Sequence, residues 1–205
     1  MPDRIVVFLD YQNVYRRARG AFHDEVNDPA VNGQINPLAL ALLIASRGTV
    51  TRELKQVRVY RGRPDSAKQP DSYGANLRQC EAWEHLSLAV NVTTRTLRYP
   101  LNWPAERAQE KGIDVSLAVD FVVMAVRGEY DVGVIMSTDT DLKPALEAVT
   151  TLRGVNAYPR SEVAAWSVPG GHSRRLAINA ANLWCHWLNK QDYESVADAT
   201  DYNLP

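Results

Sequence analysis

The chain alternates between short apolar runs and longer segments in which apolar residues recur at helical spacing. Residues 4–9 (RIVVFL) form a continuous apolar run rich in β-branched side chains, which is typical of a strand buried on both faces. Residues 131–136 (DVGVIM) repeat this pattern. Weaker strand patterns are found at 56–61, 89–97, 155–158 and 164–168.

Helical segments lie between these predicted strands. Pro37 is expected to open one of them, because proline is tolerated in the first turn of a helix. The predicted helices are 12–22, 38–46, 72–88, 114–127, 142–152 and 173–189. The polar segments 23–36 and 98–112 are predicted to be loops, and 191–205 an acidic, flexible tail after a domain that spans 1–190.

Strands that alternate with helices predict an α/β fold with a mainly parallel central sheet covered on both faces. In such sheets, sites form beyond the carboxyl ends of the strands, near the point where the strand order switches. We therefore expect chemistry after Leu9, after Met136, and at a helix start that faces them.

The composition is that of an ordinary globular domain, with 45% hydrophobic and 23% charged residues. No apolar run approaches the roughly 18 to 20 residues needed to span a bilayer, and the N-terminal run lacks a signal-peptide cleavage site. Cys80 and Cys185 lack metal-ligand spacing and are interpreted as reduced core residues of a cytoplasmic protein.

The net charge of −1 does not favour a strongly basic nucleic-acid binder, but the charges are unevenly distributed. Residues 112–150 hold seven acidic and two basic residues, and the segments on both sides have a basic surplus. This arrangement suits a metal site that also attracts a phosphate backbone, and it equally suits an ordinary partition of solvated charges.

Carboxylates are concentrated at the predicted strand ends. Asp10 follows the first strand, Asp139 and Asp141 follow the strand that ends at Met136, and Asp114 opens an apolar helix. Oxygen ligands of this kind suit Mg²⁺ or Mn²⁺ better than zinc.

Each of these residues also has a structural interpretation. Asp10 is suited to an Asx turn, and Asp114 and Asp141 stand where a helix N-cap would contribute about 1 kcal/mol. Asp120 lies inside an apolar helix and on a different face from Asp114, so we interpret it as a supporting or structural residue.

Three segments together, VVFLDYQN, KGIDVSLAVD and YDVGVIMSTDTDLKPAL, resemble the signature of NYN domains. These domains form part of the PIN-like nuclease superfamily, and the match is to its LabA-like branch. The resemblance covers about residues 4–150 and implies a Rossmann-like three-layer sandwich. Two departures are Thr138, where glycine is common, and Ala181-Asn182, where Ala-Asp is common.

The resemblance implies Mg²⁺- or Mn²⁺-dependent hydrolysis of RNA. It assigns Asp10, Asp114 and Asp139 as metal ligands, Asp141 as a further ligand or water-positioning residue, and Asn13 as the residue that orients the site. The RNA is expected to be single-stranded or structured with exposed bases, and a homodimer is a candidate assembly.

Basic and aromatic residues near the predicted strand ends are candidates for RNA contacts, because arginine binds phosphate and aromatic rings stack on unpaired bases. The candidate substrate-binding residues are Lys111, Arg61, Arg63, Arg95, Arg98, Arg174, Ser137 and Thr138. An exposed charged rim is the alternative interpretation, and His172 is a weaker candidate for acid–base chemistry.

Three rival functions are a catalytically inactive RNA- or protein-binding module, a DNA nuclease, and a phosphotransferase with Asp10 as nucleophile. The phosphotransferase usually needs an acid two residues after the nucleophile, and this position is Gln12. The dinucleotide-binding fingerprint and the P-loop are both absent from the sequence.

Overall fold

A computed structural model of the chain describes residues 1–48, 50–154 and 158–204. Its centre is a six-stranded, all-parallel sheet with the strand order β3-β2-β1-β4-β5-β6. The strands are β1 (Asp3–Asp10), β2 (Arg52–Arg63), β3 (Val90–Thr96), β4 (Val132–Met136), β5 (Arg160–Trp166) and β6 (Cys185–Leu188). The predicted α/β fold with a parallel central sheet is confirmed.

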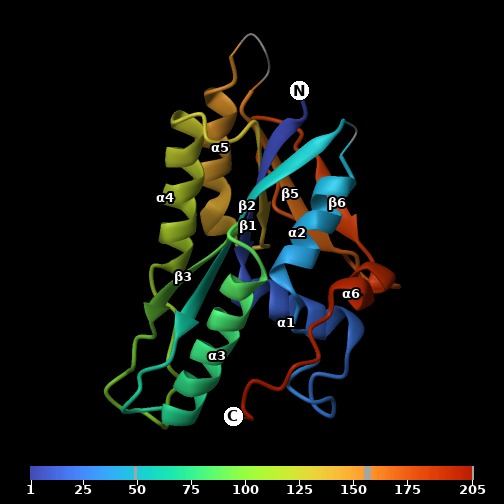
Figure 1. Cartoon of the computed structure of the whole chain (residues 1–205). Coiled ribbons are helices and arrows are strands. Elements are labelled where there is room, and N and C mark those ends of the chain that lie inside the picture. The colour runs from blue at the N-terminus through green and yellow to red at the C-terminus, as the bar shows by residue number, and fades with distance from the viewer. Residues whose placement is uncertain (49, 155–157, 205) are drawn as a thin grey trace.

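Helices cover both faces of this sheet and make three layers (Figure 1). One face is covered by α1 (Tyr11–Phe22), α2 (Pro37–Ser46), α3 (Pro70–Leu86) and α6 (Lys190–Val196). The other face is covered by α4 (Ile113–Val126) and α5 (Lys143–Thr151), which follows the short 3-10 turn η1 (Thr140–Leu142).

β1 shows why its sequence is continuously apolar. Ile5, Val7 and Leu9 pack into the core beneath α1 and α2, whereas Val6 and Phe8 pack beneath α4 and α5. Successive side chains of a strand point to opposite faces, so a central strand that is buried on both sides needs apolar residues at every position.

The strand order switches between β1 and β4. β1 leads outward through β2 to β3, and β4 leads in the other direction through β5 to β6. The carboxyl ends of all six strands lie at one edge, because the sheet is parallel, and Asp10 and Ser137 stand on either side of the switch point.

The predicted helix 173–189 is wrong. Its last part is the edge strand β6, which pairs with β5 from Val163↔Cys185 to Trp166↔Leu188. The preceding residues run without helical structure and bury Leu176, Ile178 and Leu183 against the α4–α5 side of the core. Apolar spacing in a short segment is compatible with a helix or a strand. Here the segment forms a strand because it pairs with the exposed edge of β5.

Several of the C-terminal residues 190–204, in the region predicted to be an acidic, flexible tail, contact the rest of the domain in the structure. Asn189 and Asp192 make a capping box for α6, and Tyr193 and Val196 are buried in the core. The guanidinium of Arg78 then donates to the carbonyl of Tyr202 at 2.7 Å. The strand predicted at 155–158 lies largely outside the described residues.

Candidate active site

Asp10 is the last residue of β1 and the N-cap of α1. Its Oδ1 accepts a 3.4 Å hydrogen bond from the backbone amide of Asn13, and its Oδ2 accepts a 2.8 Å bond from the hydroxyl of Ser137. Only 9% of the residue is exposed. Asp10 therefore caps a helix and also turns one carboxylate oxygen toward the end of β4, so the two interpretations of this residue are compatible.

The position of Asp10 is unfavourable for a negative charge. Burial raises the pKa of its carboxyl to about 6, although the hydrogen bonds from Ser137 and Asn13 lower it. The nearby negative charges of Glu110 and Asp139 raise the pKa further. An ionised Asp10 would consequently be stabilised by a cation at this place.

Asp139 reaches the same place from the other side of the switch point. Its amide donates to the Ser137 hydroxyl at 3.0 Å, so that one hydroxyl links Asp139 to Asp10. Its own Oδ1 accepts from the amide of Asp141 at 3.0 Å and caps η1. Asp139, and not Asp141, is therefore the cap of this turn.

Asn13 connects α1 to the loop after β4. Its Oδ1 accepts hydrogen bonds from the amide and the hydroxyl of Thr138, at 3.1 and 3.2 Å. The guanidinium of Arg17 also donates to the Thr138 hydroxyl, at 3.0 Å. Asn13 thus ties α1 to the loop that carries Asp139.

Asp114 lies in the first turn of α4, but it is not the cap of that helix, because the N-cap is Gly112 with φ +75°. Asp114 and the exposed Asp141 both line a groove between α4 and α5. Asp120, six residues further along α4, accepts hydrogen bonds from Arg58 and Tyr60. It therefore helps to hold α4 against β2.

Glu110 belongs to this group of acids, and the sequence patterns did not single it out. Its Oε1 accepts from the amide of Gly62 at the end of β2, where a side chain on residue 62 would collide with it. Burial raises the pKa of Glu110, the charges of Arg16 and Arg61 lower it, and the charge of Asp114 raises it. The one available signal was its place directly before the Lys-Gly-x-Asp segment.

The charges of four acids at this edge of the sheet therefore act on one another. Asp139 and Glu110 act on Asp10, and Asp114 acts on Glu110. Across the described ranges, no three acidic, histidine or cysteine side chains are grouped tightly enough to form a protein-only metal cage. Mg²⁺ is commonly held by one or two carboxylates and several waters. The all-oxygen donors around Asp10 fit a cation of that kind.

The basic candidates divide into two groups. Arg61 lines a polar cavity together with Glu110, and Arg174 and His172 line a smaller cavity of about 300 Å³ with Thr138 and Arg17. These residues adjoin the acids.

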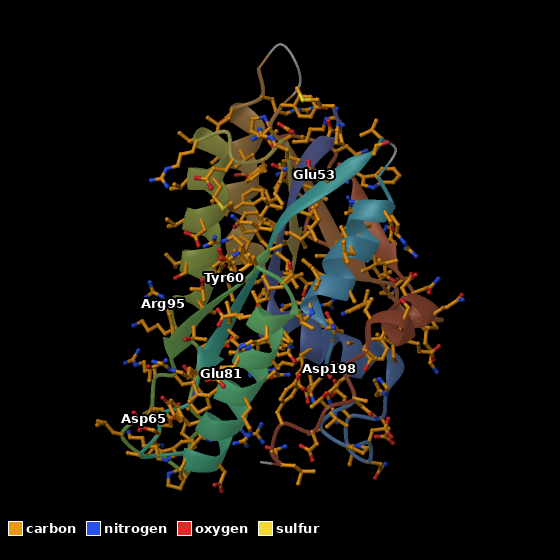
Figure 2. The ribbon with its side chains drawn as sticks, in the orientation of Figure 1. Glu53, Tyr60, Asp65, Glu81, Arg95 and Asp198 are labelled. Carbon is orange, nitrogen blue, oxygen red and sulfur yellow. The ribbon has the colours of Figure 1, made fainter. Side chains whose placement is uncertain are left out.

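The remaining basic candidates line neither of these two cavities. Arg63 stacks on Tyr73 of α3, Arg95 donates to the Ser116 hydroxyl at 2.7 Å, and the backbone of Arg98 pairs with Gln109. Lys111 is exposed. Figure 2 shows Arg95 near the β3 edge of the sheet, away from Asp198 on the other side of α3.

Within the described part of the chain, no helix combines the length and the apolar character needed to cross a bilayer.

The sequence profile of the NYN domain family matches residues 4–165. No curated protein sequence matches the chain. One similar solved structure is a protein of unknown function from Vibrio parahaemolyticus, with 15% identity, a TM-score of 0.48, and coverage of 80% of this chain and 81% of that chain.

Proposed function

The chain belongs to the NYN domain family, which is part of the PIN-like nuclease superfamily, and we propose that it is a metal-dependent ribonuclease that hydrolyses phosphodiester bonds. The observation that carries the proposal is the Asp10 carboxylate. It is buried at the switch point, tied to Ser137, and surrounded by the charges of Asp139 and Glu110. Ionisation of Asp10 is unfavourable here unless a cation offsets the negative charge, as is expected of a cation-binding site.

In this proposal Asp10 and Asp139 are the principal ligands, because Ser137 links the Asp10 carboxylate to the Asp139 backbone and the charge of Asp139 acts on Asp10. Asp114 and Asp141 approach from the α4–α5 side and act through bound water or as additional ligands. Glu110 completes the negative field from the β2 side.

When bound, Mg²⁺ or Mn²⁺ would lower the pKa of water and offset the negative charge of a phosphate. The protein residues do the rest of the positioning. Asn13 holds the loop of Asp139, and Arg61 and Arg174 provide positive charge beside the carboxylates. RNA with unpaired bases is the proposed substrate.

The test is cleavage of a labelled single-stranded RNA, and of the matching DNA, with Mg²⁺, Mn²⁺ or a chelator. We expect RNA cleavage that the chelator abolishes, and a loss of at least about 100-fold for Asp10→Asn and Asp139→Asn. Asp71→Asn is the matched control, because Asp71 is an exposed acid in the first turn of α3.

A binding module without activity is the second candidate, and the lack of a tight three-acid group among the described residues favours it. Calorimetric titration with Mn²⁺ separates the two candidates. Cation binding without cleavage of any RNA would support the module and contradict the ribonuclease.

A further inference from the structure

A polar cavity of about 910 Å³ lies directly beside the acids. It is an open cavity bordered by α1, α3, the end of β2, the loop before α4 and the C-terminal residues Tyr202 and Asn203. Tyr11 and Gln12, the two residues after Asp10, line it, and Glu110 belongs both to the cavity and to the acidic group. The cavity therefore adjoins the acidic group at Glu110.

The inner end of the cavity holds a preorganised arginine. The guanidinium of Arg61 lies 4.9 Å from the ring centroid of Tyr11 and 5.3 Å from that of Trp83, and its Nη1 donates to Gln79. Gln79 in turn donates to the Tyr11 hydroxyl at 3.1 Å. Among the described residues, the buried Nε of Arg61 has no hydrogen-bond partner.

Positive charge predominates in the lining. Arg16, Arg61 and Arg107 line the cavity, against the single carboxylate of Glu110. An arginine held by rings and an amide can offer its remaining N–H donors to a phosphate with little loss of side-chain entropy.

Two further tyrosines line the cavity. Tyr15 stacks on Tyr11 with ring centroids 6.3 Å apart, and Tyr202 belongs to the C-terminal segment. Figure 1 shows this segment running down from α6 between α1 and α3, and Figure 2 shows Asp198 in it.

The C-terminal segment is fixed in place by several contacts. Arg78 donates to the carbonyl of Tyr202, the Tyr202 hydroxyl donates to Asp198 at 2.8 Å, and the amide of Asp198 donates to the carbonyl of Gln34. The family match ends at residue 165, so this wall lies outside the matched region.

We infer that this cavity binds one unpaired nucleotide of the substrate strand, with its phosphate toward Arg16 and Arg61 and its base toward Tyr15 and Tyr202. The inference rests on the proposed function and specifies its substrate. The volume is within the range of small-ligand pockets and is sufficient for a nucleotide. Bases in a duplex are stacked and paired, so only an unpaired base can enter such a cavity and stack on its rings.

The experiment measures binding without cleavage. The probe is a short single-stranded RNA that contains 2-aminopurine, mixed in EDTA with protein carrying Asp10→Asn. We expect quenching of the probe when its base stacks on a tyrosine, with no competition from duplex RNA. Tyr15→Ala and Tyr202→Ala should each weaken binding by about 5- to 100-fold and reduce the quenching, as expected for the loss of one base–aromatic stack.

Two sets of controls separate stacking from damage to the fold. Tyr15→Phe and Tyr202→Phe keep the rings and should recover most of the quenching that the alanine variants lose, although Tyr202→Phe also removes the hydrogen bond to Asp198. Tyr158→Ala removes a tyrosine at the opposite edge of the sheet, where its hydroxyl bonds to Asp3, and should leave binding unchanged. Thermal unfolding of each variant identifies a loss of fold.

The results distinguish this inference from the proposed function. Quenching that depends on Tyr15 and Tyr202, in a protein that cleaves no RNA, would support the cavity and contradict the ribonuclease. Cleavage by the parent protein together with unchanged binding by both alanine variants would overturn the cavity alone. Absence of any binding to single-stranded RNA would also overturn it.

Discussion

The hydroxyl of Ser137 donates a 2.8 Å hydrogen bond to Oδ2 of Asp10 and joins the end of β4 to the end of β1. The same oxygen accepts from the amide of Asp139. One buried hydroxyl therefore links the Asp10 carboxylate to the backbone of Asp139, the two acidic residues that the proposed mechanism uses most.

Ser137→Ala should reduce both stability and activity. It removes a hydrogen bond that lowers the pKa of Asp10 and leaves the Asp139 amide without its acceptor. We expect the free energy of unfolding to fall by about 2 kcal/mol, a typical value for a hydrogen bond to a charged group. Urea unfolding measures this change.

Ser161→Ala is the matched control, because Ser161 is also buried but its Oγ has no partner among the described residues. It should be neutral or slightly stabilising. An equal loss from both serine variants would show that burial, and not the bond to Asp10, explains the effect.

Asp10→Asn should stabilise the metal-free protein at pH 7 while it abolishes activity. The folded-state pKa of about 6 lies above the ordinary value of 3.8, so the unfolded chain releases this proton first as the pH rises. Ionised Asp10 therefore lowers the free energy of unfolding by about 3 kcal/mol above pH 6. Asp10→Asn should recover this amount, reduced by any hydrogen bonding that the asparagine loses.

Urea unfolding at pH 4 and pH 7 in EDTA checks this sign. The stability of the parent protein should contain a component that decreases between these pH values, and Asp10→Asn should lack it. A variant that is less stable than its parent at pH 7 would contradict the predicted cost of the buried charge.

Glu110→Gln should weaken cation binding, because it removes a negative charge that acts on Asp10. We expect the apparent dissociation constant for Mn²⁺ to rise by about 10-fold, which corresponds to about 1.4 kcal/mol. Glu106→Gln is the control, because Glu106 is an exposed acid in the same loop. Equal effects of the two changes in a calorimetric titration would remove Glu110 from the site.

Glu162→Gln should destabilise the fold through a buried ion pair away from the site. Glu162 accepts two hydrogen bonds from Arg52 and one from His186, and the side chains of these three residues are 7%, 2% and 1% exposed, respectively. Removing one partner of a buried pair leaves an uncompensated charge and costs about 3–5 kcal/mol. Glu53→Gln, at an exposed acid one residue from Arg52, should cost little.

The pH dependence of this pair has the opposite sign to that of Asp10. Burial raises the pKa of Glu162, but the hydrogen bonds from His186 and Arg52 outweigh burial, and the net pKa is lowered. Its contribution is therefore complete above the ordinary glutamate pKa of 4.5 and is lost as the pH falls through the lowered value. Acid unfolding of Glu162→Gln should lack this component.

The local pattern of the sequence predicted much of the fold. The continuous apolar run of β1 correctly indicated a strand buried on both faces, and Pro37 correctly marked the start of α2. These features depend on near neighbours in the chain, because strand burial, proline geometry and helical spacing act within a few residues.

The sequence by itself also determined which acids stand at strand ends, because a parallel sheet brings the carboxyl ends of its strands to one edge. Only the tertiary structure decided which of them meet and what surrounds them. It holds Glu110 by a hydrogen bond from Gly62, where the charge of Glu110 acts on Asp10, and it makes Asp139 the cap in place of Asp141. It also makes residues 185–188 an edge strand and places Tyr202 on the wall of a cavity. These contacts join segments that are distant in sequence, and they depend on how whole faces pack and which sheet edge is left open, which no local pattern records.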